Sequence, residues 1–489
     1  MVLLEEPAAL WGVLALLIVL CAFCYLRKFS SNLRSTPLLL NGCHPLYGSY
    51  LKQKKKYLAG YLLVAAGDWF QGPYLYALYV SDSLSSFSIT CLYLLGYTSA
   101  LVVGTAVGSL GDRVGRKRNS MLAAIFYIFS CVLICRGEFP LLVTGRLCGG
   151  IASSLFHSSF EAWVTSAHAR AMLPPEWLAI TFGDASFGNG IVAIVVGIAS
   201  SVLTDRWGVR APFLAAAACN FAALAAIWVL WASPQTTTTP ISSATDITPT
   251  SPHILPRAIS PALHPPPPPP PPEPAPPAAD GISGALALFR AEPSIAALGL
   301  ALALFEGTMY TFVYFWTPAL APNHEPLPFG LIFAAFMAAV MLGGATFSLV
   351  AASQRMPVER FAVLVYLVGT VSLLFGLFCG SSTYSVFLLF CLFEAVCGAY
   401  HATAGTLRSK VIPDRVRATV LNLFRVPLNA MVMGTMGLTF VLSTRALLLL
   451  SACLLAAGTA ILQGALSCRT RLENATKNGT SSLVPPEPV

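Results

Sequence analysis

Long apolar stretches, separated by short polar segments, make up most of the chain. Each runs for about 18–25 residues, enough for an α-helix to cross a hydrocarbon core ~30 Å thick. Because a backbone inside a bilayer must satisfy its own hydrogen bonds, the pattern predicts an all-α integral membrane protein. The stretches are residues 8–26, 57–79, 88–110, 119–136, 139–164, 178–203, 211–232, 294–320, 328–351, 361–380, 383–405, 417–442 and 445–467.

A proline-rich segment at residues 233–284 interrupts this pattern. It holds seventeen prolines, eight of them consecutive from Pro265 to Pro272, and such a composition does not pack a core. We interpret it as a disordered cytoplasmic linker, with a spacer role favoured over an SH3-type ligand. The predicted parts are an anchor helix with a basic connector (1–56), an N-terminal six-helix bundle (57–232), the linker (233–284), a C-terminal six-helix bundle (285–467) and a disordered tail (468–489).

Composition and charge placement support a membrane protein. Hydrophobic residues make up 56% of the chain, charged residues 10%, and the mean hydropathy is +0.71. The net charge is +8. If the loop after residues 88–110 is cytoplasmic, few basic residues lie on the opposite side of the membrane, so their distribution follows the positive-inside rule. Nucleic acid is therefore not expected as a partner, whereas the lipid bilayer is. The first stretch, preceded by Glu5 and Glu6 and followed by Arg27 and Lys28, predicts an uncleaved anchor.

The sequence lacks the motifs of enzymes and metalloproteins. Its thirteen cysteines form no framework, and the Cys21–Cys24 pair lies inside an apolar stretch without further ligands. No phosphate-binding loop and no nucleophile–base pattern occurs. We expect no cofactor, no bound metal and no enzymatic activity.

The segment Gly108–Lys117, GSLGDRVGRK, joins two apolar stretches and carries a specific motif. It resembles the loop between the second and third helices of the major facilitator superfamily, G-x-L-(A/G)-D-R-x-G-R-K. The resemblance implies the superfamily fold of two six-helix bundles, here with an extra N-terminal transmembrane helix, and a secondary transporter with alternating access. In such a carrier, a latch between Asp112 and Arg116 would close the cytoplasmic side. The gating-loop residues are Gly108, Asp112, Arg113, Gly115, Arg116 and Lys117.

Ionisable residues at bilayer depth are costly and mark candidate sites. We number the twelve apolar stretches after residues 8–26 as helices 1–12. In the superfamily fold, helices 1, 4, 7 and 10 line the cavity, and each carries one acid here. Helices 5 and 11 also border it. The candidate substrate-binding or coupling residues are Asp68, Gln71, Glu161, Asp184, Glu306, Glu394 and Arg425, with Arg146 as a candidate relay.

Several of these assignments have alternatives. Arg425 suits an oxyanion because its planar fork donates two parallel hydrogen bonds, but it could instead neutralise Glu306 or Glu394. Glu161 fits either a substrate contact or a gate pair with Arg116. Asp68 stands beside Gly72–Pro73, which should break the helix, and a packing role is the alternative.

Five segments together resemble the molybdate-anion transporter family: residues 68–79, 111–119, 145–163, 303–318 and 408–429. The resemblance implies uptake of molybdate, a tetrahedral dianion, and acids at membrane depth add a proton as a candidate co-substrate. Asp184 departs from the basic residue expected there. The alternatives are a carrier of a sugar, drug or organic cation, or a non-transporting sensor. We expect a monomer in the plasma membrane, with an endomembrane as the alternative.

Overall fold

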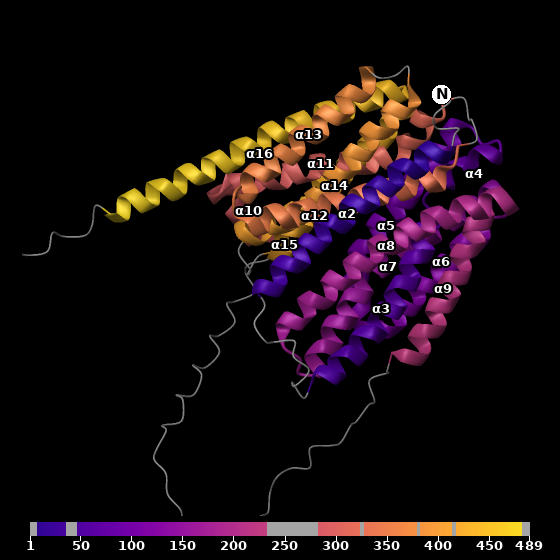
Figure 1. The fold of residues 1–489 in the computed structure, drawn as a ribbon, viewed down its shortest axis with the longest axis horizontal. Helices are drawn as coiled ribbons and strands as arrows, with labels where there is room; N and C mark the ends of the chain where they lie inside the picture. Colours follow the sequence, from indigo (N-terminus) through magenta and orange to yellow (C-terminus); the bar gives the residue numbers. More distant parts are fainter. Residues whose placement is uncertain are drawn as a thin grey trace, which may run out of the picture.

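The structure, a computed structural model, describes residues 7–35, 46–231, 282–322, 327–378, 382–412 and 417–481, with some side chains in these ranges left out, those of 103–114 among them. Helices form all regular secondary structure in these ranges. They fall into two groups joined through the linker, indigo to magenta and orange to yellow in Figure 1. The elements are α2 (Pro7–Ser35), then α3 (Tyr47–Trp69), α4 (Leu75–Ser81), α5 (Ser86–Val114), α6 (Arg116–Ile134), α7 (Phe139–Arg170), α8 (Pro175–Trp207) and α9 (Ala211–Leu230) in the N half, and α10 (Ile282–Ala291), α11 (Pro293–Leu320), α12 (Phe329–Ser353), α13 (Val358–Phe378), α14 (Thr383–Val411), α15 (Arg417–Leu438) and α16 (Thr444–Ser481) in the C half.

Ten described helices are long and apolar enough to cross a membrane. The apolar part of α5 that the structure describes, Ser86–Val102, is shorter. The first predicted helix of the N half, 57–79, is divided into α3 and α4 by a turn at Gly72–Pro73, as the sequence predicts. Proline breaks the helix there because it has no N–H to donate and its ring clashes with the preceding turn.

Three boundaries differ from those expected. α3 begins at Tyr47, so the end of the predicted basic connector is helical. α10, which the sequence analysis did not predict, starts inside the expected linker, and its Phe289 ring stacks on Phe424 of α15 at 6.1 Å. α16 continues to Ser481, past the expected end at 467, because no proline interrupts the polar residues that follow. Residues 232–281 and 482–489 lie outside the described part.

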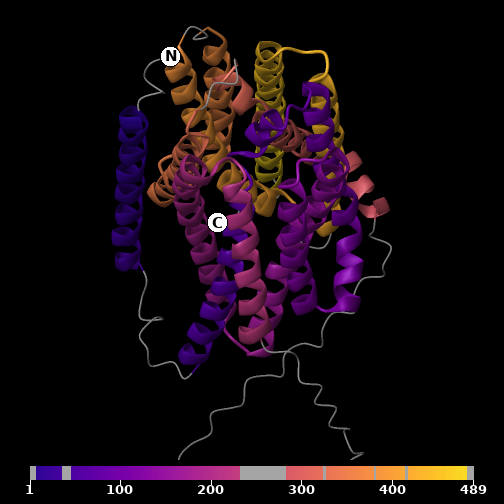
Figure 2. The ribbon, with the colours of Figure 1, turned by 90° about the vertical axis from the view of Figure 1, so that its right-hand side faces the viewer.

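The two halves pack against each other chiefly through α8 and α12. Gly197 and Gly330 bring the two backbones together, and a Cβ on Gly197 would lie 2.7 Å from the Gly330 carbonyl oxygen. The extra helix α2 packs on α12, and its Tyr25 ring contacts Phe187 of α8 at 4.7 Å. Figure 2 shows α2 at the periphery of the molecule, where it covers the seam between the halves.

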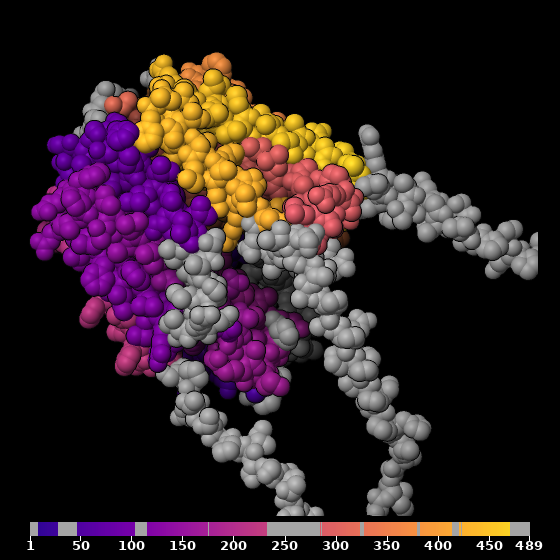
Figure 3. Space-filling view, turned by 180° about the vertical axis from the view of Figure 1, so that it is seen from behind, coloured from indigo at the N-terminus to yellow at the C-terminus, as the bar shows by residue number. Residues whose placement is uncertain are grey.

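The ends of the bundle differ in charge. We call the end with the α5–α6 turn the basic end, because it carries Lys54, Arg116 and Lys117, and the opposite end, with α4, the outer end. The ribbons of the two halves meet at the outer end and diverge toward the basic end (Figure 1). The space-filling view shows them as two lobes that abut on one side (Figure 3).

Candidate substrate-binding site

A carboxylate and two arginines form a charged cluster halfway along the C half. Glu306 of α11 accepts a hydrogen bond from the Tyr400 hydroxyl of α14 at 3.0 Å. Arg408, two turns further along α14, places Nη1 3.9 Å from the same carboxylate oxygen. Arg425 of α15 is exposed and also attracts the Glu306 carboxylate. The cluster therefore carries one negative and two positive groups.

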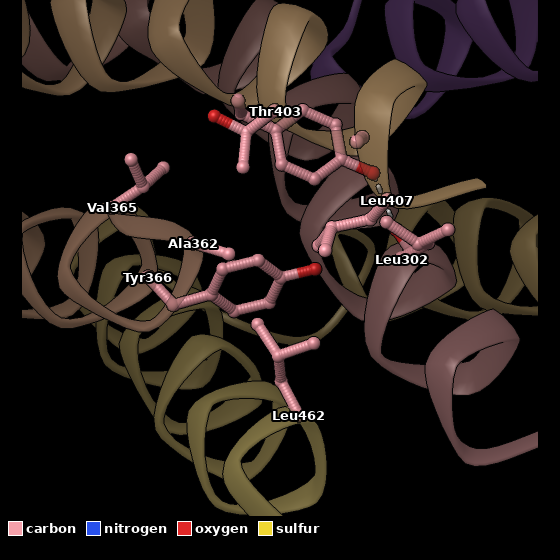
Figure 4. A pocket seen from close by; sticks show the side chains of 9 residues that line it. Leu302, Ala362, Val365, Tyr366, Thr403, Leu407 and Leu462 are labelled. Carbon is pink, nitrogen blue, oxygen red and sulfur yellow. Dashed lines mark hydrogen bonds between the residues drawn. The ribbon is translucent and has the colours of Figure 1, made fainter. Parts of the chain in front are cut away.

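Aromatic packing fixes the position of this cluster. The Tyr400 ring stacks on Phe305 at 3.9 Å and 5°, and Phe305 also contacts the Tyr366 ring at 4.9 Å. Tyr366 donates a hydrogen bond to the Ala301 carbonyl at 3.0 Å. Figure 4 shows the apolar crevice beside the Tyr366 ring, lined by Leu302 among others. It has no room for a water molecule, so it offers no space for a ligand on this side of the rings.

The N half holds a second buried carboxylate. Asp68 of α3 accepts a hydrogen bond from the Tyr127 hydroxyl of α6 at 2.8 Å, and His157 and Arg146 of α7 attract it. Arg146 donates from Nε to the Leu92 carbonyl at 3.2 Å. One permanently charged residue, Arg146, thus acts on Asp68, as two arginines act on Glu306 in the other half.

A cavity of about 230 Å³ opens between α3, α7 and α8. We call it the tyrosine cavity, after Tyr57 and Tyr61 in its wall. His157, Glu161 and Asn189 also line it. The predicted residue Glu161 is exposed there.

Other predicted residues lie apart from both carboxylates. Gln71 donates from Nε2 to the Gly67 carbonyl at 3.2 Å and so supports the backbone at the α3–α4 turn. Asp184, which stands where the resemblance implies a basic residue, forms an ion pair with Lys54 of α3. The lysine neutralises the charge of this acid. Glu394 is half-buried on α14, where the described residues offer it no hydrogen bond or ion pair.

The gating loop is only partly described. The surroundings of Gly108 and the side chains of Asp112 and Arg113 lie outside the described part, and with them the expected Asp112–Arg116 latch. Gly115 has φ +94°, which separates α5 from α6. Arg116 donates from Nη1 to the Ala162 carbonyl at 3.1 Å, and Lys117 donates to the Trp228 carbonyl at 3.0 Å. The expected ion pair of Arg116 with Glu161 is not formed; the guanidinium binds the neighbouring backbone oxygen.

Arg408 and Tyr400 were not among the residues that the sequence singled out. The apolar stretch that predicts their helix ends at 405, whereas α14 continues to Val411. Arg408 therefore looked like a loop residue at the cytoplasmic face. Its position two helical turns after Tyr400 and on the same face was the signal that could have found it.

The helical fold and the match to a family model together show a transporter of the major facilitator superfamily. The family described as "Sugar-transporters, 12 TM" matches residues 12–245 and 278–391. Two solved structures share the fold, each at low identity. They are a bacterial homologue of the iron transporter ferroportin (TM-score 0.62, 12% identity, 85% of this chain and 98% of that one) and a D-xylose–proton symporter (TM-score 0.59, 13%, 86% and 97%).

Within the superfamily, the chain belongs to the molybdate-anion transporter family. It is 31% identical to the molybdate-anion transporter of Takifugu rubripes over 393 residues, 76% of each chain. It is 30% identical to that of Xenopus laevis over 430 residues, 86% of this chain and 83% of the relative. The expected fold class, family and transporter class are thereby confirmed, and the chain is an integral, multi-pass membrane protein.

Proposed function

We propose that this transporter carries molybdate across its membrane by alternating access. The observation that carries the proposal is that two arginines of the C half act on one carboxylate: Arg408 forms an ion pair with Glu306, and Arg425 attracts it electrostatically. Guanidinium groups donate parallel hydrogen bonds to tetrahedral oxyanions, and two of them match the charge of a dianion. The names of the relatives support molybdate as the anion.

Glu306 gives the site a means of coupling to protons. As a carboxylate it holds Arg408 through an ion pair and Tyr400 through a hydrogen bond. An arriving dianion would compete for the arginines and would be repelled by the ionised acid. A proton on Glu306 removes that repulsion and supplies a donor to an anion oxygen. Molybdate and a proton would therefore travel together.

The test is uptake of labelled molybdate at nanomolar concentration by cells that lack molybdate carriers of their own. Arg425→Gln and Arg408→Gln should each lower uptake at least tenfold, because a hydrogen bond to a charged group contributes about 1.5–3 kcal/mol. Arg445→Gln is the matched control, since Arg445 is an exposed arginine near the outer end. All variants are compared at equal surface expression.

Three results would contradict the proposal. Wild-type protein at the cell surface that moves no molybdate would point to another solute, with labelled sugars and organic cations tested next. Unchanged uptake in both arginine variants would remove the anion from this site. Glu306→Gln with full uptake and an unchanged pH profile would exclude proton coupling through Glu306.

A further inference from the structure

The tyrosine cavity in the N half has walls suited to a ligand other than an oxyanion. The rings of Tyr57 and Tyr61 stack at 5.5 Å and 22°, and those of Tyr61 and Phe156 at 5.4 Å and 23°. Phe160 meets the Tyr61 ring edge-on at 6.3 Å. These rings provide a continuous aromatic surface, and aromatic faces attract cations through their quadrupoles.

The polar groups of the cavity favour the same kind of ligand. Glu161 places an exposed carboxylate there, and its charge acts on Tyr57. Neither an ion pair nor a hydrogen bond engages Glu161 within the described part of the chain. His157 Nδ1 lies 2.9 Å from the Ser153 carbonyl oxygen, which can only accept, so Nδ1 carries a proton. In the neutral ring, Nε2 is then left as an acceptor.

Cationic side chains are missing from the described lining of the cavity. Asp68, attracted by His157, adds a second negative group nearby. Asn189 accepts a hydrogen bond from Trp69 Nε1 at 2.9 Å, which fixes its amide with the NH₂ group free to donate. A dianion would be repelled here, whereas the arginines of the C half would repel a cation. The two halves therefore present sites of opposite charge preference.

We propose that the tyrosine cavity binds a small organic cation, a single ammonium group on a ring-sized apolar body. Glu161 would pair with the ammonium, and Tyr57 and Tyr61 would contact the body and the charge. The cavity, at about 230 Å³, is smaller than the ~300–1,000 Å³ typical of drug-sized ligands. The cation is a second ligand, and the inference does not depend on molybdate being the anion.

The test is calorimetric binding of 2-phenylethylammonium to the purified full-length protein in lipid nanodiscs. 2-Phenylethanol, which has the same ring and chain without the charge, should bind at least tenfold more weakly. Glu161→Gln should weaken binding of the ammonium at least tenfold and leave the alcohol unchanged. Tyr61→Leu, which keeps an apolar wall but removes the ring, should also weaken the ammonium more than the alcohol.

Matched controls separate this site from the arginine pair. Glu138→Gln changes a carboxylate at the other end of the same helix, outside the cavity, and should leave binding unchanged. Arg425→Gln should also leave it unchanged, whatever its effect on molybdate uptake. Every variant must show the wild-type unfolding temperature.

Each remaining outcome overturns the proposal. Absence of heat with folded wild-type protein shows that no such cation binds. Equal binding of the ammonium and the alcohol shows an apolar cavity without charge selection. If the Glu161→Gln variant still binds the ammonium, the cation binds outside the tyrosine cavity. If Arg425→Gln abolishes binding, the tyrosine cavity and the arginine pair belong to one site.

Discussion

Gly96 of α5 leaves the space that the Arg146 guanidinium fills. A Cβ at Gly96 would collide with the end of the Arg146 side chain, which also lies over the Tyr93 ring at 5.6 Å. The arginine thus crosses from α7 to α5, donates to the Leu92 carbonyl and stays close to Asp68. These contacts join α7 to α5, so Arg146, which the sequence proposes as a relay, also pairs two helices.

Gly96→Ala should displace Arg146 and lower stability. The end of Arg146 can move aside, so the cost comes from its lost hydrogen bond to Leu92: we expect the free energy of unfolding to fall by about 1–3 kcal/mol, with Arg146→Gln similar. Because both changes disrupt one contact, the double variant should cost clearly less than the two single costs added together. Thermal unfolding of purified protein measures this, and Gly464→Ala, where nothing lies within 4 Å of the added Cβ, is the control. Strictly additive effects would mean that Gly96 and Arg146 act independently.

The sequence reveals lone charges better than their partners. Asp68 and Glu306 stand out because each is an acid within an apolar stretch. Arg408 and Lys54 do not, because each lies just beyond an apolar stretch, where a basic residue is ordinary. Which cation reaches which acid depends on how helices distant in sequence cross, and the pattern of a single chain does not contain that information.

At the scale of elements, apolar length predicts the transmembrane helices, and proline predicts the break between α3 and α4. Helices that depend on context are missed. α10 is short and amphipathic, and its Phe289 ring stacks on that of Phe424. Its helical form therefore depends on a neighbour far along the chain. The polar end of α16 extends an apolar helix that is already formed, which avoids the cost of nucleation.

The contact between α12 and α14 depends on two glycines that face each other's helix. A Cβ on Gly343 would collide with the Ala395 carbonyl oxygen, and one on Gly398 with that of Val340. Backbone cannot move aside as a flexible side chain can. Gly344, the next residue, has only the Gly398 carbonyl oxygen at 3.7 Å, an ordinary contact.

Gly343→Ala should therefore destabilise the C half, whereas Gly344→Ala should not. We expect a loss of about 1–3 kcal/mol for the first and a change within about 1 kcal/mol for the second. The unfolding temperatures of the two variants, purified in the same detergent, give the comparison. Equal temperatures would show that α12 and α14 can separate at no cost.

At the scale of the molecule, the described hydrogen bonds between the halves gather at the outer end. Tyr314 of α11 and Thr90 of α5 are hydrogen bonded at 2.8 Å, and Thr439 donates to Thr90 at 3.3 Å. The Leu331 amide donates to Ser201 at 2.9 Å. Because the ribbons diverge toward the basic end, this arrangement corresponds to a carrier closed at its outer end. Alternating access would require these contacts to break.

Tyr314→Phe tests whether these contacts hold the outer end closed. The change removes the hydroxyl bonded to Thr90 but keeps the ring that meets Tyr93 edge-on at 5.4 Å. A hydrogen bond contributes about 0.5–1.5 kcal/mol, so the ratio of outer-open to outer-closed molecules should rise about two- to tenfold. Spin labels at the exposed residues Ser85 and Ser443, one on each half, would then show more of the longer distance.

Tyr384→Phe is the control for this measurement, because Tyr384 contacts Phe387 within its own helix and joins no pair across the halves. Its distance distribution should match that of the wild type. If Tyr314→Phe also leaves the distribution unchanged, the hydroxyl pair does not hold the outer end closed. The closure would then rest on the close backbone contact of Gly197 and Gly330, and α8 and α12 would be the elements that set the resting state.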